Sequence, residues 1–453
     1  MENGFLRRII PMNSRKVSGN AFSTFSAILI SSAVTFAGEQ PQPWEVNDPL
    51  VTIEKSIFIE CTDPQAAPLC VLGYIGPDLD RYMIRAVERV DDVHAKPRAE
   101  FSGDNGRTWS VSVPLPDQIH QYQGIWSSES SFPSPVIYDP RSRMAVGFTL
   151  RQMKTEERYY HTTYYRLSPD LGRTWSKPKQ VQYESGAAFD PENPLQPGYS
   201  DNNQAYPGLG TLLHSNGTLI HPLCLVNIPR DAPDPNPHKL HHWHIHRDSR
   251  SIGSLCMIGG WNPNRNDYDW TAGSPVWLPR HISLRGLNEP DIAELTEGRV
   301  LVVWRGSNTA MTAGRKWYSI SSNGGRTFSD VQPWTYDNGA RFYSSASPGN
   351  FLKHSNGRLY WLGNVCHSPP HGNHPRYPLI LGEVNQRTGL LIRHSLTAID
   401  DRQPHHSEAV QFSNCKFFED RETHAIEIYL TAYGEHTDDW RHANCYKYTL
   451  TLN

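Results

Sequence analysis

The sequence predicts an all-β fold, a single six-bladed β-propeller of four-stranded antiparallel blades, and three observations lead to this prediction. An octad that contains Ser, Asp or Asn, Gly, Thr and an aromatic residue occurs three times. Six strand–turn–strand units are spread along the chain, as six blades would require. Gly, Pro, Trp and Tyr are numerous, at 33, 35, 13 and 21 of 453 residues. Many turns and many aromatic residues favour short strands over long helices.

The octad is a turn motif, and its copies are SGDNGRTW at 102–109, SPDLGRTW at 168–175 and SSNGGRTF at 321–328. Its Asp carboxylate can accept backbone N–H bonds across the turn. Its Gly permits a positive φ angle, and its aromatic residue can pack beneath the turn. We therefore interpret Asp104 and Asp170 as structural residues. We expect each octad to connect the third and fourth strands of a blade.

The second repeated pattern is an apolar strand, a polar turn and another apolar strand. Asn-Gly between apolar runs is a strong hairpin signal. The pattern is clearest at 212–220, 295–304 and 351–362, and weaker at 61–69, 139–143 and 419–424. These six units predict six blades, with the octads in the first, second and fourth.

The first 37 residues have the composition of an export signal. Basic residues from Arg7 to Lys16 precede an uncharged apolar run at 21–37, whose end, Thr35-Phe36-Ala37 before Gly38, suits a small-residue cleavage site. This run is short for a membrane span. We expect residues 1–37 to be a cleaved signal peptide and 38–453 to form the propeller. The mature protein would then be secreted or periplasmic, without a membrane span.

The charge of the chain excludes some classes of partner. The net charge is −3, and no basic run is present. We therefore expect neither nucleic acid nor a membrane surface as partner. We expect the protein to be a monomer.

The octads resemble the Asp boxes, or BNR repeats, of the sialidase superfamily, and the resemblance covers roughly residues 50–450. This superfamily contains sialidases, other glycosidases, polysaccharide lyases and binding proteins. The resemblance therefore implies the scaffold more strongly than the reaction. In sialidases three arginines hold the substrate carboxylate, a Glu-supported Tyr is the nucleophile, and an Asp is the acid/base.

The resemblance assigns some of these roles to residues of this chain. Segment 288–305 is similar to the blade that supplies the supporting Glu and one arginine, which implies Glu289 and Arg305. Segment 374–379 is similar to the strand that brings another arginine, which implies Arg376. Two positions depart from the family pattern. Residues 54–59 contain no arginine where one is expected, and Phe412 stands at the place of the nucleophilic Tyr.

The chemistry of these residues supports a site for an acidic sugar. Arg305 and Arg376 could grip a uronate or sialate carboxylate bidentately, with Arg151 of blade two as a third cation. Glu289 and Asp291 lie two apart on a predicted strand and should face the same way. Paired carboxyl groups are what glycoside hydrolysis requires. Glu129 or Glu408, from other blades, are alternative partners for Glu289.

A second chemistry uses His161, just before the second octad, and Tyr206, at the start of blade three. In a uronate lyase, arginine neutralises the uronate, one group takes the C5 proton, and another protonates the leaving oxygen. A His/Tyr pair beside arginines would suit these steps. The arrangement is similar to that of the ulvan-lyase propellers.

Two further features concern ligands. His242, His244 and His246 would share one face of a strand, and two of them could hold a divalent metal with a ligand from elsewhere. The alternative is a polar strand edge, and the sequence predicts no other metal or cofactor. Trp126 is a candidate for stacking on a sugar face.

These observations lead to one leading function and two alternatives. The leading function is exo-acting, sialidase-like hydrolysis of an acidic oligo- or polysaccharide. The alternatives are a uronate lyase that uses His161 and Tyr206, and a non-catalytic glycan-binding propeller. In each case we expect the site on the face opposite the octads.

Overall fold

The computed structural model describes residues 51–122, 124–154, 159–187, 196, 202–226, 252–279, 281–437 and 439–453. They form β-strands, with two short 3₁₀ helices, η2 (Thr296–Gly298) and η3 (Arg393–Ser395). Within these ranges, no helix has the length and apolarity needed to cross a membrane.

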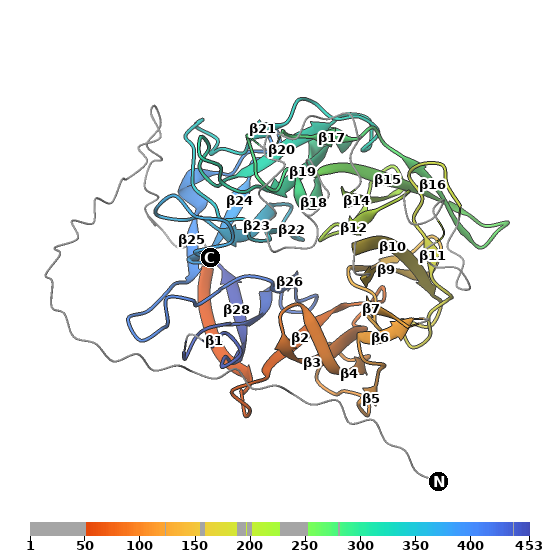
Figure 1. Cartoon of the computed structure of the whole chain (residues 1–453), viewed down its shortest axis with the longest axis horizontal. Coiled ribbons are helices and arrows are strands. Elements are labelled where there is room, and N and C mark those ends of the chain that lie inside the picture. Colours follow the sequence, from red (N-terminus) through yellow and green to blue (C-terminus); the bar gives the residue numbers. More distant parts are fainter. Residues whose placement is uncertain are drawn as a thin grey trace, which may run out of the picture. The chain divides into compact units, whose positions relative to one another are not determined.

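Six antiparallel sheets follow one another around a central axis (Figure 1). Blade one contains β2 (Ala67–Tyr74), β3 (Arg81–Val90), β4 (Val93–Ser102) and β5 (Val113–Pro114). Blade two contains β8 (Val136–Asp139), β9 (Met144–Lys154), β10 (Tyr159–Ser168) and β11 (Lys179–Gln180), with β6 (Ile119–Tyr122) and β7 (Ile125–Glu129) added beside β9. Blade three contains β12 (Ala205–Pro207) and β13 (Leu212–Leu213), then β14 (Leu219–Leu225), β15 (Gly253–Asn262), β16 (Asp267–Ala272) and β17 (Val276–Trp277).

The remaining blades are simpler. Blade four contains β18 (Asn288–Glu294), β19 (Val300–Arg305), β20 (Lys316–Ser321) and β21 (Gln332–Pro333). Blade five contains β22 (Asn350–Lys353), β23 (Leu359–Asn364), β24 (Leu379–Val384) and β25 (Thr397–Asp400). Blade six contains β26 (Lys416–Glu419), β27 (Ile426–Thr431), β28 (Cys445–Leu452) and β1 (Val51–Ile59). The predicted six-bladed, all-β propeller is confirmed.

Blade six closes the ring by joining the two ends of the described chain. Its outermost strand, β1, pairs antiparallel with β28, so that Val51 lies opposite Leu452. Figure 1 shows the red β1 beside the blue β28. The closure therefore depends on strand pairing between residues that are about as far apart in the sequence as the propeller allows.

Five of the six predicted hairpins connect the first and second strands of a blade. The turn at 61–69 is a correction, because it leads from β1 of blade six into β2 of blade one. The hairpin of blade one lies instead at 75–80, between β2 and β3. A strand–turn–strand pattern is the same within a blade and between blades, so the pattern alone did not separate the two. Residues 54–59 consequently belong to blade six and not to blade one.

All three octads connect the third and fourth strands of their blades, as predicted. In the second octad, Asp170 Oδ1 accepts bonds from Ser168 Oγ and from the Thr174 N–H, both at 2.8 Å. Its Oδ2 accepts the Thr174 hydroxyl at 2.6 Å. Gly172 has a φ of 82°, which favours glycine. The carboxylate is therefore satisfied inside its own octad.

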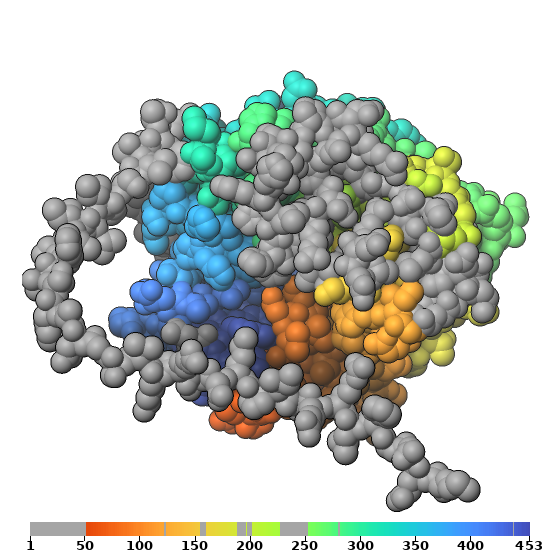
Figure 2. Space-filling model, viewed as in Figure 1, coloured from red at the N-terminus to blue at the C-terminus, as the bar shows by residue number. Residues whose placement is uncertain are grey.

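The core is divided among the interfaces between neighbouring blades. Six clusters of buried apolar side chains each span two adjacent blades. Between blades four and five, for example, Trp334 meets Trp361 edge to face with ring centroids 5.1 Å apart. In Figure 2 the light blue atoms of blade five and the darker blue atoms of blade six lie against each other on the face in view. Burial of these apolar faces holds the blades in a ring.

Candidate functional site

The strand directions place the candidate residues at the end of the blades opposite the octads. In blade four, β18 begins and β19 ends at this end, where Asn288 lies opposite Arg305. The octad at 321–328 follows β20, at the other end. Arg376 precedes the third strand of blade five, which also starts at the end opposite the octads. This is the face on which the sequence predicted the site.

Glu289 and Arg305 form a close ion pair. Arg305 Nη2 donates to Glu289 Oε1 at 2.6 Å. The register shifts between Asn288 and Asp291, so β18 carries a bulge in which Glu289 has a φ of 39°. Bulges re-aim side chains, and positive φ in a residue other than glycine stores strain that is typical of functional sites. Arg305 Nε is buried and has no hydrogen-bond partner in the described part of the chain.

Three arginines converge near Glu289: Arg285, Arg305 and Arg376. Their exposed fractions are 8%, 8% and 9%. Burial, and then the charge of Arg305, lowers the pKa of both Arg285 and Arg376 to about 10, while Glu289 opposes this effect. The charge of Arg305 thus acts on both Arg285 and Arg376, although burial is the larger cause of the two shifts. Arg285 was not predicted from the sequence, although it stands only four residues before Glu289.

Lys316 adds a fourth buried cation beneath the arginines. It lies opposite Arg305 in the β19–β20 ladder, and Nζ donates to the Ser345 carbonyl at 3.0 Å and to the Ser347 carbonyl. Burial, with the charge of Arg305 next, lowers the pKa of this amine to about 7. Lys316 therefore ties the chain that leads into blade five to the base of the arginine cluster.

Arg376 is anchored by blade six. Its Nη1 donates to Ser413 Oγ at 3.2 Å, and its carbonyl accepts the Phe412 N–H at 2.9 Å. Phe412 is fully buried in the apolar cluster shared by blades five and six. The position at which the family resemblance implies a nucleophilic Tyr is thus occupied by a core residue.

Arg151 belongs to an ion-pair network inside blade two. Its Nη2 lies 2.6 Å from Glu129 Oε2, and Glu129 Oε1 accepts a bond from Arg166 at 2.7 Å. Glu129 is thus shared by two arginines. Glu408, the other alternative partner for Glu289, is exposed and lies 3.7 Å from Arg402. Both alternative carboxylates therefore have arginine partners of their own.

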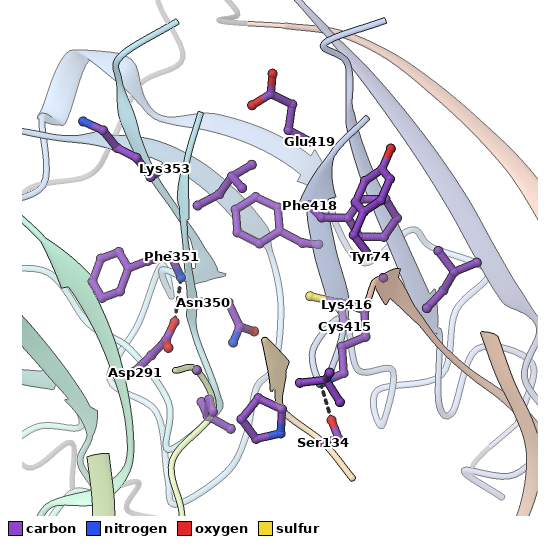
Figure 3. A pocket seen from close by; sticks show the side chains of 18 of the residues that line it. Tyr74, Ser134, Asp291, Asn350, Phe351, Lys353, Cys415, Lys416, Phe418 and Glu419 are labelled. Carbon is purple, nitrogen blue, oxygen red and sulfur yellow. Dashed lines mark hydrogen bonds between the residues drawn. The ribbon is translucent and has the colours of Figure 1, made fainter. Parts of the chain in front are cut away.

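Asp291 lines a cavity of about 530 Å³ that runs between the first strands of the blades. Figure 3 shows it with Asn350 and Phe351 on one side and Lys416 on the other. Asp291 Oδ2 accepts the Phe351 N–H at 2.7 Å, and burial raises the pKa of Asp291 to about 7. Lys416 Nζ donates to Ser134 Oγ at 3.1 Å. In a regular strand, Glu289 and Asp291 would face the same way, as the sequence predicted. The bulge at Glu289 interrupts the regular alternation of side chains along β18.

His161 and Tyr206 are in contact. Their rings stack with centroids 4.7 Å apart, and Gln152 Nε2 donates to the Tyr206 hydroxyl at 2.8 Å. Burial raises the pKa of Tyr206, and the charge of Glu289 acts in the same direction. The structure therefore brings this pair together, and the charge of Glu289 acts on it.

An acidic segment of blade one, which the sequence analysis missed, faces the arginines. Glu88 is buried, and its Oε1 accepts the Asp92 N–H at 2.6 Å. The charges of Asp91 and Asp92 act on Arg376. The other Glu88 oxygen accepts the hydroxyl of Tyr433, from blade six. Ligand atoms of Glu88, Asp91 and Asp92 lie within 4.8 Å of one another, a spacing that a metal ion would permit.

Two further predicted features concern ligands. His242, His244 and His246 lie outside the described residues. Trp126 is partly exposed on β7, where it lies opposite Gln121 and Lys154.

Comparison with known proteins supports the fold. No protein-family model matches the chain, and no curated protein matches it. A crystal structure of a protein of unknown function from Dyadobacter fermentans has a TM-score of 0.58 and 13% identity, over 90% of this chain and all of that one. The NanB sialidase of Streptococcus pneumoniae has a TM-score of 0.53 and 12% identity, over 88% of this chain and 70% of that one. This chain therefore has the sialidase-like six-bladed propeller fold that its octads predict.

Proposed function

We propose that the chain is a glycoside hydrolase that acts on a glycan with a sialic or uronic acid residue, whose carboxylate binds Arg285, Arg305 and Arg376. The convergence of these three buried arginines carries the proposal. A carboxylate would form charge-assisted hydrogen bonds with the guanidinium groups and relieve their repulsion. NanB, which is similar in fold, is a sialidase.

Glu289 is the proposed base of this reaction. It is the carboxylate in contact with Arg305, so it lies next to the place where the sugar acid would bind. Hydrolysis needs one carboxylate that activates water or supports the nucleophile, and a second group that protonates the leaving oxygen. Glu289 suits the first role. The ion pair with Arg305 and the bulge hold it in one orientation.

A uronate lyase is the second candidate, because the rings of His161 and Tyr206 stack on each other and the charge of Glu289 acts on Tyr206. In this reaction the arginines would stabilise the charge that develops when the C5 proton leaves. His161 would take that proton, and Tyr206 would protonate the leaving oxygen.

We propose further that the substrate is extracellular and that residues 1–37 direct export to the periplasm or the medium as a cleaved signal peptide. The basic start and the uncharged run before Gly38 support this proposal. Sequencing the N-terminus of the exported protein tests it, since cleavage after Ala37 would leave Gly38 as the first residue. An N-terminus at Met1 would contradict it.

A time course on a panel of sialosides and acidic polysaccharides separates the functions. Hydrolysis releases reducing ends without ultraviolet absorbance, whereas a lyase produces both because its product is unsaturated. Retention on immobilised polysaccharide without either signal would indicate the binding protein. Release of reducing ends alone is the outcome that the hydrolase predicts.

Glu289→Gln tests the role of the base. We expect kcat to fall at least about 100-fold, which is the usual contribution of a positioned base. Glu408→Gln is the matched control, because Glu408 is exposed and lies 3.7 Å from Arg402. If Glu289→Gln retained wild-type kcat, Glu289 would not be the base.

A further inference from the structure

We infer that the cavity between the first strands of the blades is a second binding site, which takes one uncharged pyranose unit at the octad end of the propeller. The cavity has a volume of about 530 Å³, within the usual range for small-molecule sites. Arg285, Arg305 and Arg376 are not among the described residues that line it. The inference therefore does not depend on the hydrolase proposed above, whose site lies at the other end of the blades.

The cavity opens at the octad end. Ser355, Arg421 and His424 line it, and all three are exposed in turns between the first and second strands of their blades. These turns lie at the same end as the octads, because successive strands of a blade run in opposite directions. A ligand can therefore enter from solvent without passing the arginine cluster.

A carboxyl group and an amine face the interior of the cavity. Asp291 lies on one side and Lys416 on the other (Figure 3). No ion pair joins them in the described part of the chain, although each charge acts on the pKa of the other. Lys416 Nζ donates to Ser134 Oγ at 3.1 Å, and its other N–H groups have no acceptor among the described residues. An oxygen of a ligand would complete the hydrogen bonds of this amine.

The wall of the cavity fixes the position of the carboxyl group. Asp291 is only 3% exposed, and its Oδ2 accepts the Phe351 N–H at 2.7 Å. Its Oδ1 lies where residue 210 has no side chain, since a Cβ at Gly210 would be only 2.2 Å from this oxygen. The carboxyl group is thus a fixed polar point, as a specific ligand site requires.

Aromatic rings supply the apolar part of the lining. Tyr74, Phe351 and Phe418 are half-buried and border the cavity (Figure 3). A pyranose has C–H faces that pack on aromatic rings and hydroxyl groups that bond to polar side chains. The combination of three rings with a few fixed polar groups therefore matches the two kinds of surface that a sugar presents.

The two charged groups favour an uncharged ligand. Lys416 opposes the entry of a cation. Burial raises the pKa of Asp291 to about 7, so above that pH its carboxylate opposes an anion. A sugar hydroxyl can accept a hydrogen bond from Lys416 Nζ while another donates to Asp291, whether or not the carboxyl group is ionised.

Saturation-transfer NMR and titration calorimetry with free galactose, glucose, mannose and rhamnose test the site. We expect at least one of these sugars to bind, with a millimolar Kd because so small a ligand makes few contacts. Lys416→Met, which removes the N–H donors, should raise this Kd at least about tenfold. Lys353→Met is the matched control, because Lys353 also lines the cavity but donates to the Gly357 carbonyl and to Gln386 Oε1. The Kd of this control should stay within about twofold of wild type.

A second variant and a competitor make the test specific to this cavity. Asn350→Leu replaces a polar side chain of the wall by an apolar one and should also raise the Kd at least about tenfold. It decides the test if Lys416→Met does not fold. Free glucuronate, which would occupy the arginine cluster, should not displace the sugar. Arg376→Met should leave the Kd unchanged for the same reason.

The outcomes also separate this site from the proposed function. If the wild type shows no saturation transfer to any of the four sugars, or if folded Lys416→Met keeps the wild-type Kd, the site is wrong. Displacement of the sugar by glucuronate would place it at the arginines and would also overturn the inference. So would binding of glycine or inorganic phosphate in place of a sugar. A wild type that binds the sugar but releases no reducing ends would overturn the hydrolase and leave this site standing.

Discussion

Charged side chains have different surroundings at the two ends of the blades. At the octad end, Asp170 receives its hydrogen bonds from residues at most four positions away. At the other end, Arg285, Arg305 and Arg376 are buried together and repel one another. Polar groups that hold a fold are normally satisfied within it, whereas closely spaced buried charges with shifted pKa values are typical of functional sites. The octads thus serve the fold, and the arginine cluster is the proposed site for a ligand.

The largest expected effect comes from the arginine end, in Arg376→Met. We expect kcat/KM to fall about 100-fold or more, because a buried charge-assisted contact with the substrate is lost. The melting temperature should stay the same or rise, since burial and the charge of Arg305 both disfavour the cation. Activity assays and thermal melts check this prediction. Arg326→Ala, at an exposed octad arginine, is the control that should keep wild-type activity.

The second prediction concerns the pH dependence of stability, which Asp291→Asn should change. Burial raises the pKa of Asp291 from 3.8 to about 7, so the folded protein favours the neutral acid. The free energy of unfolding contributed by this group should therefore fall as the pH rises from about 4 to about 7. The amide removes this loss, and Asp291→Asn should be more stable than wild type by about 1–3 kcal/mol at pH 8. Denaturant titrations of both proteins at pH 4 and pH 8 measure the difference.

Asp104 in the first octad has a pKa shift opposite in sign to that of Asp291, so its effect on stability should depend on pH in the opposite way. Hydrogen bonds from Thr108 lower its pKa to about 2. Its stabilising contribution is present above pH 4 and is lost as the pH falls toward 2. Asp104→Asn should therefore reduce the acid sensitivity of the fold without changing stability differences between pH 6 and pH 8. If the stability of Asp104→Asn differed from wild type only above pH 6, this prediction would be wrong.

A smaller effect is expected at the octad end in Asp170→Ala. The variant loses the acceptor for the Thr174 N–H and for two hydroxyls. By analogy with the loss of a side-chain cap, the free energy of unfolding should fall by about 1–2 kcal/mol. The value of kcat/KM should stay within about twofold of wild type. A large loss of activity in a folded variant would show that the two ends are not independent.

The smallest effect concerns the third octad, which has Asn323 in place of Asp. Its Oδ1 accepts the Thr327 N–H at 2.9 Å, and its Nδ2 donates to the Thr327 hydroxyl at 2.8 Å. Asn323→Asp would replace the amide contact with two carboxylate acceptors. We expect a gain of a few tenths of a kcal/mol, measurable as a slightly higher denaturant midpoint. Destabilisation would show that the amide is required.

The local features of the fold could be predicted from the sequence. The octads and five hairpins were placed correctly because each is specified by residues a few positions apart. The turn at 61–69 was misplaced because the closure of the ring pairs β1 with β28, at opposite ends of the chain. No pattern near residue 61 carries that information.

The site was predictable only where the family resemblance reached it. Glu289, Arg305 and Arg376 came from that resemblance, and the structure places the two arginines in one cluster with Glu289. Arg285 was missed because it precedes β18 in an irregular segment. Glu88 and Tyr433 were missed because they meet only through folding, 345 positions apart. The bulge in β18 gives Glu289 and Asp291 different surroundings, and no pattern in the sequence indicates this bulge.

The pairing of β1 with β28 also means that the chain could be circularly permuted. Val51 and Leu452 lie opposite each other on adjacent strands, so a short linker could join the two ends of the propeller. New ends could then be opened at the exposed turn near Asn338 and Gly339, between blades four and five. A circular permutant of this design would keep every blade covalently intact and leave the arginine cluster untouched. Chain order is therefore a separable property of this architecture, distinct from the arrangement of the proposed binding site.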